Sequence, residues 1–386
     1  MCAGGERGGG QYASTWGDEE EAPSVAHRQE RRSRREVEEV VDVDVRRYVE
    51  QMEREDEDAH CHPTDDPSPW RDSQELSLKM RSVKLNKVCA MSTSVHDQHF
   101  VAQLARSCPG KVVPAFGYHP WFAHQISLCD STTKEDHYRS LFLAQADADA
   151  GTSSRTLEAK NQLEDLLPHL PPPIALSDII QTLRRNLQEH PTALVGEVGM
   201  DRIFRLPMSA HGYTRDPTLS CLSTPLSHQL SILSAQVQVA ISLRRSVSLH
   251  SVKAGDATLA WVREMDRRWP GSGRRTKHVD LHSCSLSAEM IRTNAHPNIY
   301  ISFSLTINAR QKSLAHQIRA CRADRLLVES DWHSAHGLSA RTWAALRFVA
   351  DIKQELRQGE ERGSEAGYEK AAYCLRSNWN RFIRGE

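Results

Sequence analysis

The sequence predicts an α/β protein folded as a (β/α)8 barrel, the TIM-barrel architecture. Apolar, β-branched runs of strand length recur along the chain from residue 83 onward. Stretches of helical periodicity lie between them, and repeated strand–helix units imply a parallel sheet. One further strand at His60 and His62 brings the count to eight, the number that closes such a barrel. An open doubly wound sheet is the alternative, but no glycine-rich phosphate loop follows the first strand.

The strands are expected where a short run of β-branched and other apolar residues is bounded by polar or turn-forming residues. The first is the extended segment that carries the two histidines. The others are expected at 83–91, 111–117, 193–198, 245–250, 276–282, 298–304 and 325–331.

The helices are expected where apolar residues recur three or four positions apart. Ile179, Leu183 and Leu187 show the pattern, because this spacing puts them on one face of a helix. The same spacing marks six more helices, at Phe100 and Leu104; Leu230, Leu233, Val237 and Ile241; Leu259, Val262 and Trp269; Leu314 and Ile318; Trp343, Leu346 and Ala350; and Tyr368, Ala372, Leu375, Trp379 and Ile383.

An N-terminal extension is expected at residues 1–57, which mostly lack a core-forming pattern, so the barrel should span 58–386. We expect this extension to be disordered or partly helical. The cluster Arg31–Arg35 is typical of a solvated charge run, with a nuclear import signal as the alternative. The valines between residues 37 and 49 suit a short amphipathic helix.

Two insertions are expected within the barrel, at about 123–176 and 203–226. Both follow the C-terminal end of a strand, the face where barrel active sites lie, so both could shape a substrate cleft. Within the first, residues 144–173 are expected to form a disordered surface loop, because a polar low-complexity run precedes a proline cluster.

Composition and charge exclude several classes of protein. The 386 residues carry a net charge of −1, so a phosphate-binding surface must be local rather than global. Nine scattered cysteines without a C-x-x-C pair favour reduced thiols, and hence a cytoplasmic or nuclear location, over a disulfide framework. No apolar run is long enough to span a membrane, and the N-terminus lacks the apolar core of a signal peptide.

Six metal-binding side chains occupy equivalent positions at the ends of predicted strands. The two histidines of the H-x-H triplet point to one side, because side chains alternate along a strand. Strand ends converge at the barrel mouth, so all six are expected to surround one point. Four imidazoles and two carboxylates can hold two divalent ions with one carboxylate bridging, an arrangement that activates water for phosphoester hydrolysis. The six are His60, His62, Glu197, His250, His282 and Asp331.

The stretches that carry these residues are Asp58-Ala-His-Cys-His, Gly117-Tyr-His-Pro-Trp121, Gly196-Glu-Val-Gly-Met-Asp201, Ser248-Leu-His250, Leu281-His282-Ser and Glu329-Ser-Asp331. Their order and spacing, over roughly residues 58–386, resemble the TatD family of metal-dependent deoxyribonucleases in the amidohydrolase-like barrel superfamily. Phe204-Arg-Leu-Pro207 and the stretch from Ile301 to Asn308 resemble fungal TatD-like proteins in particular.

The resemblance implies a barrel that binds two divalent ions and cleaves DNA from the 3′ end, on single strands or 3′ ends. It implies that Asp331 also accepts a proton from the attacking water. The implied ligand sets are His60, His62 and Asp331 for one ion and His250 and His282 for the other, with Glu197 bridging both.

Four residues near the strand ends are candidates for binding phosphate. His119 matches the histidine of the family's G-x-H-P motif. Arg202 and Arg205 follow the strand that carries the bridging carboxylate, and a guanidinium can bind phosphate oxygens bidentately. Lys253 lies next to Val252, where many family members carry an arginine, and a lysine lacks that bidentate geometry.

The first strand and one loop depart from the family pattern. Family members place an apolar run before the H-x-H triplet, whereas this chain has the charged residues 54–57. A charged strand is poorly suited to a barrel wall, so we expect the strand to be short or frayed, or replaced by part of 37–49. The glycine usual after the fourth histidine is also absent from His282-Ser-Cys-Ser-Leu-Ser287.

The function indicated is a metal-dependent deoxyribonuclease that acts as a 3′–5′ exonuclease. The altered first strand and Val252 keep a second hypothesis open, a non-catalytic barrel that binds a protein partner through its insertions. A third is a hydrolase of another substrate class, such as amides or lactones. A histidine-rich ligand set suits Zn or Mn, whereas nuclease chemistry often uses Mg.

Overall fold

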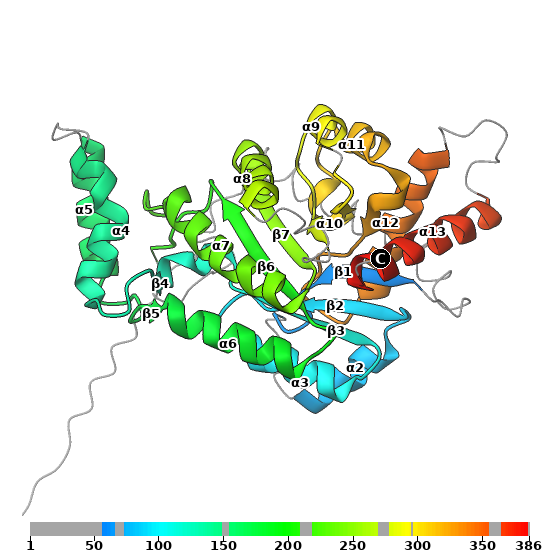
Figure 1. Ribbon diagram of the computed structural model, residues 1–386, viewed down its shortest axis with the longest axis horizontal. Coiled ribbons are helices and arrows are strands. Elements are labelled where there is room, and N and C mark those ends of the chain that lie inside the picture. The colour runs from blue at the N-terminus through cyan, green and yellow to red at the C-terminus, as the bar shows by residue number, and fades with distance from the viewer. Residues whose placement is uncertain are drawn as a thin grey trace, which may run out of the picture. The chain divides into compact units, whose positions relative to one another are not determined.

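Eight parallel strands form one sheet that curves into a nearly closed barrel, with the helices around its outside (Figure 1). The strand order in the sheet follows the order in the chain, and every neighbouring pair is parallel. The predicted (β/α)8 barrel is therefore confirmed. Its strands are β1 (Glu57–Cys61), β2 (Lys87–Met91), β3 (Val112–Phe116), β6 (Leu194–Asp201), β7 (Val247–Val252), β8 (Val279–Leu281), β9 (Ile299–Phe303) and β10 (Leu326–Val328).

The structure is a computed structural model that describes residues 56–65, 73–148, 154–208, 218–268, 278–294, 296–354 and 364–384. All of these residues belong to one unit of the chain, Val45–Glu386. The cluster Arg31–Arg35 and the valines of 37–49 lie outside the described residues. The expectations for them, and for the extension 1–57 as a whole, remain predictions.

Most outer helices bury an apolar face. In α6 (Leu176–Glu189) the predicted residues Ile179, Leu183 and Leu187 are buried, because their spacing aligns them on one side. The other helices around the barrel are α2 (Ser73–Ser82), α3 (Gln98–Ser107), α7 (Leu226–Leu243), α8 (Gly255–Arg268), α9 (Ala288–Thr293), α10 (Leu305–Asn308), α11 (Leu314–Ala320), α12 (Leu338–Gln354) and α13 (Glu365–Arg384).

β6 is longer than the sequence predicted and changes the place of the central carboxylate. It was expected to end at residue 198 but continues to Asp201, because it pairs with β7 as far as the Asp201–Val252 register. Glu197 and His250 therefore lie inside their strands rather than at their ends. Other strands are shorter than predicted; for example, β2 begins only at Lys87, β8 ends at Leu281 and β10 ends at Val328.

β1 corrects the expectation of a short, frayed or replaced first strand. It is as long as β2 and β3, and all five of its residues are buried. Glu57 is tolerated in the barrel wall because Asn86 Nδ2 donates to its Oε1 at 3.0 Å, and the Arg376 guanidinium lies 4.0 Å away. Burial still raises the pKa of Glu57 to about 7, against the hydrogen bond from Asn86 and the charge of Arg376.

The seam of the barrel, between β1 and the segment after β10, is closed by hydrogen bonds to a buried carboxylate. Asp58 is fully buried, and its Oδ1 accepts the backbone N–H of Ser330 at 3.1 Å. Its Oδ2 accepts the hydroxyl of Thr342 in α12 at 2.6 Å. The backbone continues the closure, since Asp331 donates to His60 O at 3.0 Å. Burial raises the pKa of Asp58 to about 6 in spite of these bonds.

The first insertion contains two helices, where a disordered loop at 144–173 was expected. α4 (Lys134–Ala148) and α5 (Ser154–Leu166) pack side by side (Figure 1) around buried Tyr138 and Leu163. The expectation was wrong for 154–166. It gave weight to the polar run that precedes this stretch, although leucines recur there at helical spacing. Residues 149–153 lie outside the described residues.

Two further contacts anchor this hairpin to the barrel. Its base is fastened by β4 (Ile126–Ser127) and β5 (Ile174–Ala175), which pair with each other. In the second insertion, Leu206 and Leu222 join the apolar core of the hairpin. The two insertions therefore pack against each other, although residues 209–217 of the second lie outside the described part of the chain.

The first testable prediction concerns Glu57→Gln. The folded-state pKa of about 7 lies above the ordinary value of 4.5, so the contribution of Glu57 to stability is lost as pH rises through that interval. Glutamine is neutral and still accepts the Asn86 hydrogen bond. Between pH 5 and pH 8 the variant should therefore gain on the order of 1–2 kcal/mol in unfolding free energy relative to the parent chain. Urea unfolding monitored by circular dichroism, with chelator present, measures this difference.

The matched control is Glu75→Gln, a carboxylate on α2 whose side chain is 41% exposed. It should leave the pH dependence of unfolding unchanged. Equal shifts for both variants would mean that the burial of Glu57 is not the cause.

Candidate metal centre

Five imidazoles and two carboxylates converge at the C-terminal mouth of the barrel. Each comes from a different place in the chain, but parallel strands bring their C-terminal halves to one end. The contributions are His60 from β1, His62 just after it, His119 after β3, Glu197 from β6, His250 from β7, His282 after β8 and Asp331 after β10.

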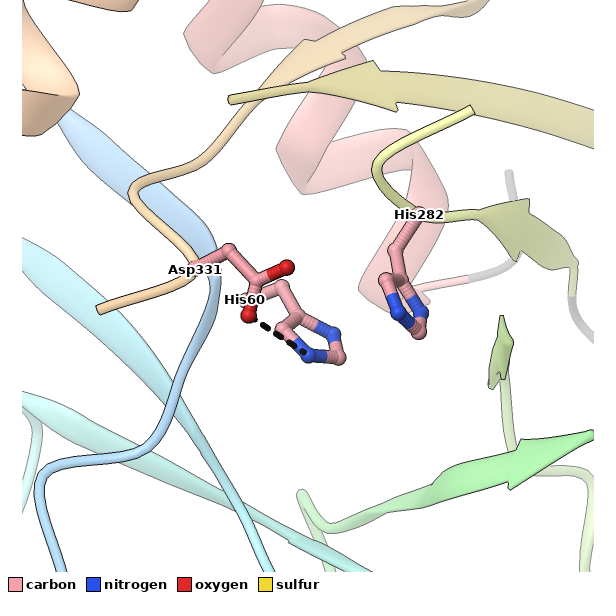
Figure 2. Close-up of side chains that lie close together, drawn as sticks. All are labelled: His60, His282 and Asp331. Carbon is pink, nitrogen blue, oxygen red and sulfur yellow. Dashed lines mark ion pairs between the residues drawn. The ribbon is translucent and has the colours of Figure 1, made fainter. Parts of the chain in front are cut away.

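The Oε2 atom of Glu197 faces the first group of ligand atoms. It lies 3.5 Å from His60 Nε2 and 3.2 Å from His62 Nε2, and these two nitrogens are 3.0 Å apart. Asp331 Oδ1 lies 3.9 and 3.6 Å from the same nitrogens. In Figure 2, His60 lies between Asp331 and His282, whose ring stacks on that of His60 at 3.8 Å.

The Oε1 atom of Glu197 faces a second group. His250 Nδ1 lies 2.7 Å away, His282 Nε2 2.9 Å and His119 Nε2 3.2 Å. The structure thus gives each oxygen of one carboxylate its own set of nitrogen neighbours. His119 lies among the candidate ligands, and its expected contact with phosphate stays a prediction.

These spacings fit divalent ions. Ligand atoms about 2.0–2.1 Å from one ion lie about 3.0–3.4 Å from one another in octahedral or tetrahedral geometry. Three triplets of residues bring their ligand atoms within 4.8 Å of one another and could hold an ion. They are His60 with His282 and Asp331, His60 with His62 and Glu197, and His119 with Glu197 and His250. The mixture of imidazole and carboxylate suits Zn or Mn.

Electrostatics hold the central carboxylate in its charged form. Burial raises the pKa of Glu197, but the charges of His119 and His282 and hydrogen bonds from His119 and His250 hold it well below its usual range. Burial lowers the pKa of His62, yet the hydrogen bond and charge of Glu197 raise it to about 10. Divalent ions would take the place of such protons, since imidazole binds metal only when it is neutral.

Two polar groups orient the histidines from behind. Ser248 Oγ lies 2.9 Å from His60 Nδ1 and 3.5 Å from His282 Nδ1, which leaves the Nε2 atoms directed at Glu197. Asp201 Oδ2 lies 3.5 Å from His250 Nε2. The role of Ser248 could have been found from the sequence. It precedes His250 by two residues, so its side chain points to the same side of β7.

A buried polar network supports Asp331. Ser283 Oγ donates to Asp331 Oδ2 at 3.0 Å and lies 2.6 Å from Glu329 Oε1. Ser302 Oγ lies 2.7 Å from Glu329 Oε2 and 2.8 Å from Asp280 Oδ2. A hydroxyl has one hydrogen, so one of these two carboxyl groups must be protonated. Burial raises the pKa of Asp280 to about 6, while burial and the charges of Asp331 and Asp280 raise the pKa of Glu329 well above its usual range, which favours the proton on Glu329.

Two glycines allow β6 to approach its neighbours closely enough to place Glu197. A Cβ atom at Gly199 would lie 2.0 Å from His250 O, and its φ of 155° adds backbone strain for any other residue. A Cβ atom at Gly196 would lie 2.9 Å from Ser248 Cβ. Larger residues at either position would push β6 away from β7.

The remaining predicted site residues lie outside the cluster. Arg202 and Lys253 are exposed, and Lys253 adopts a positive φ of 50°. Arg205 Nη1 donates to the backbone oxygens of Arg202 at 3.3 Å and Phe204 at 2.9 Å. Their phosphate-binding roles stay predictions.

Comparisons with known proteins agree on a single family. The family model described as TatD related DNase matches residues 57–366. Cut9-interacting protein scn1 of Schizosaccharomyces pombe is 32% identical over 331 residues, which cover 77% of this chain and 92% of that protein. An uncharacterized deoxyribonuclease of Saccharomyces cerevisiae, YMR262W, is 28% identical over 205 residues, 51% of this chain and 57% of that protein.

A solved structure shows the same fold. The TatD homologue YjjV of Escherichia coli superposes with a TM-score of 0.50 at 17% sequence identity, covering 84% of this chain and 96% of that chain. At this identity the likeness is one of architecture, and it agrees with the barrel described above.

The second prediction is that Glu197→Gln weakens the binding of two divalent ions together. Loss of the one charge that faces both groups of nitrogens should lower Mn²⁺ affinity by on the order of 100-fold, because an anionic ligand becomes a neutral one. Isothermal titration with Mn²⁺ and elemental analysis measure affinity and stoichiometry. His316→Asn, an exposed histidine on α11, is the control and should bind as the parent chain does. Unchanged affinity in Glu197→Gln would contradict the assignment.

Proposed function

The chain belongs to the family of TatD-related DNases, and on that premise we propose that it hydrolyses phosphodiester bonds of DNA from the 3′ end. Membership identifies it as a metal-dependent hydrolase of the TatD type. The finer proposal names single strands and 3′ ends as the substrate and two divalent ions as the cofactor. It is supported by the matching family model and by the description of the Saccharomyces cerevisiae relative as a deoxyribonuclease.

The observation that carries this proposal is the position of Glu197, whose two oxygens face separate groups of imidazoles. In our proposal, one ion is held by His60, His62 and Asp331, and the other by His250 and His282 with His119 beside them. Two bound ions lower the pKa of a water molecule and stabilise the charge that develops on the phosphate.

Asp331 is suited to accept the proton of the attacking water. Its side chain is 15% exposed at the mouth, so it is open to solvent on one side. Oδ1 faces the imidazoles, while Oδ2 is fixed by the hydroxyl of Ser283. A carboxylate oriented in this way can take a proton without moving. In this scheme Arg202, Arg205 and Lys253 bind neighbouring phosphates of the strand as positive charges near the mouth.

A cytoplasmic or nuclear location remains part of the proposal. It is supported by the cysteines, because the eight in the described residues are all free thiols. Among the described helices, none has the length and apolar character needed to cross a membrane.

The third prediction concerns Asp331→Asn. Asparagine is nearly isosteric and tolerates the positive φ of 47° at this position, so the fold should persist. Turnover of a 3′-labelled single-stranded oligonucleotide with Mg²⁺ or Mn²⁺ should fall by on the order of 10²-fold, the usual effect of losing a general base. Steady-state kinetics measure the change. Asp178→Asn, an exposed residue in the first turn of α6, is the control.

Two outcomes would count against this scheme. Cleavage at the parental rate by Asp331→Asn would remove Asp331 from the chemistry. Failure of the parent chain to cleave DNA with metal bound would favour a different substrate class, such as amides or lactones, or a role in binding.

A second function, binding a protein partner, is favoured by one relative and one structural feature. The Schizosaccharomyces pombe relative is named as a protein that interacts with Cut9. The α4–α5 hairpin is a helical insertion with its own apolar core, and Leu157 of α5 remains 60% exposed. In this second proposal the hairpin is the element that contacts the partner, and Leu157 is the exposed apolar side chain on it that we choose to test.

The fourth prediction tests this binding function with purified Cut9. Leu157→Asp should weaken its binding to this chain by on the order of 10-fold or more, because it puts a charge at an apolar contact, and should leave DNA hydrolysis unchanged. Biolayer interferometry measures the affinity. Leu78→Asp on α2, where the leucine is 63% exposed, is the control and should bind as the parent chain does. Absence of binding by the parent chain, or equal binding by both variants, would rule out this anchor.

A further inference from the structure

Trp121 and Phe204 form a stacked pair of aromatic rings at the mouth of the barrel, here called the aromatic shelf. Their centroids are 5.4 Å apart and their planes differ by 16°. Trp121 lies in the short helix η1 (Pro120–Gln125), which follows β3, and Phe204 lies in the loop after β6. Both segments follow the C-terminal ends of strands, the side on which the candidate ligands gather. Trp121 remains 38% exposed.

The shelf lies next to the metal centre through two contacts. The indole ring meets the ring of His119 edge to face, with centroids 5.0 Å apart. The indole Nε1 donates to Asp201 Oδ2 at 2.7 Å, and the same oxygen is 3.5 Å from His250 Nε2. On the first path His119 alone separates the shelf from Glu197, and on the second path Asp201 and His250 do.

One buried carboxylate holds the indole of Trp121 and the backbone of Phe204. Asp201 Oδ2 accepts the indole N–H of Trp121, while Oδ1 accepts the backbone N–H groups of Ile203 at 2.8 Å and Phe204 at 3.0 Å. The indole ring and the backbone that carries Phe204 are thus held before any ligand arrives. A preorganised aromatic surface loses little conformational entropy when a flat ligand binds to it.

We propose that the aromatic shelf is a stacking subsite for the nucleobase next to the phosphodiester bond that is cut. The proposal rests on the proposed DNA hydrolysis and adds the means by which this chain selects its substrate. Basic residues attract phosphates, whereas aromatic side chains bind single strands by stacking on bases. Both kinds are present in this loop, since Arg202 and Arg205 flank Ile203 and Phe204. Ile203 is 57% exposed and extends the apolar surface.

Binding at this subsite requires that the base of the DNA substrate is unpaired. A base in a duplex is already stacked and paired, so it reaches the shelf only after strand separation. Single strands and frayed ends would therefore be preferred over blunt duplexes. Every base has an aromatic face, so the preference for sequence should be weak.

The fifth prediction concerns Trp121→Leu and a substrate that lacks one base. With an intact single-stranded oligonucleotide, Trp121→Leu should raise KM about 10-fold or more and change kcat less, the scale reported by aromatic substitutions at stacked bases. With an abasic residue at the 3′-terminal nucleotide, KM of the parent chain should rise to a similar extent. Trp121→Leu should then add no further increase, because the base that it would contact is missing.

Two further variants separate stacking from other effects. Trp121→Phe keeps an aromatic ring but loses the hydrogen bond to Asp201, so its KM should lie nearer the parental value. Tyr373→Leu removes an aromatic side chain that is 71% exposed on α13 and should leave KM unchanged. An equal rise in KM on intact and abasic oligonucleotides for Trp121→Leu would overturn the subsite.

A binding experiment distinguishes failure of the proposed DNA hydrolysis from failure of the stacking subsite. If the parent chain cleaves no DNA, the hydrolase proposal fails, and binding then decides the subsite. Fluorescence anisotropy of labelled oligonucleotides on the Asp331→Asn chain with Mn²⁺ should show weaker binding of the abasic strand. Equal binding of intact and abasic strands, or no binding of either, would overturn the subsite.

Discussion

The structure depends on a single buried carboxylate surrounded by imidazoles. Glu197 is 3% exposed, and every histidine of the centre has a ring nitrogen within 3.5 Å of one of its oxygens. Burying so many polar groups is costly unless they are paired with one another or with cations. The registers of β1, β6 and β7 must all satisfy that condition together, which explains why β6 has glycines where it approaches its neighbours.

Asp201 connects the candidate metal centre to the proposed substrate-binding surface. It contacts His250, accepts the indole N–H of Trp121 and holds the backbone of Phe204. A shift in β6 would therefore move a candidate ligand and the aromatic shelf in the same direction. Recognition of a base and positioning of its phosphate are linked by geometry, and the loop after β6 can vary only where it does not contact this carboxylate.

The barrel and the convergence of the candidate ligands could be predicted from the sequence, because both follow local rules. Apolar runs identify strands, and ligand-type residues in those runs are gathered at one end by parallel pairing. The burial of β1 could not be predicted, since Asn86 and Arg376, which offset Glu57, are distant in the chain. The position of His119 among the imidazoles has the same cause, because it depends on how the loop after β3 crosses the mouth.

The carboxylate at the seam of the barrel has a consequence for the chain while it is being made. β1 leaves the ribosome first among the strands, but the partners of Asp58, at Ser330 and Thr342, come some 270 to 280 residues later. Until then β1 is an open sheet edge, and such edges pair readily with strands of other chains. The edge of β1 therefore stays without these partners until Ser330 and Thr342 have been made.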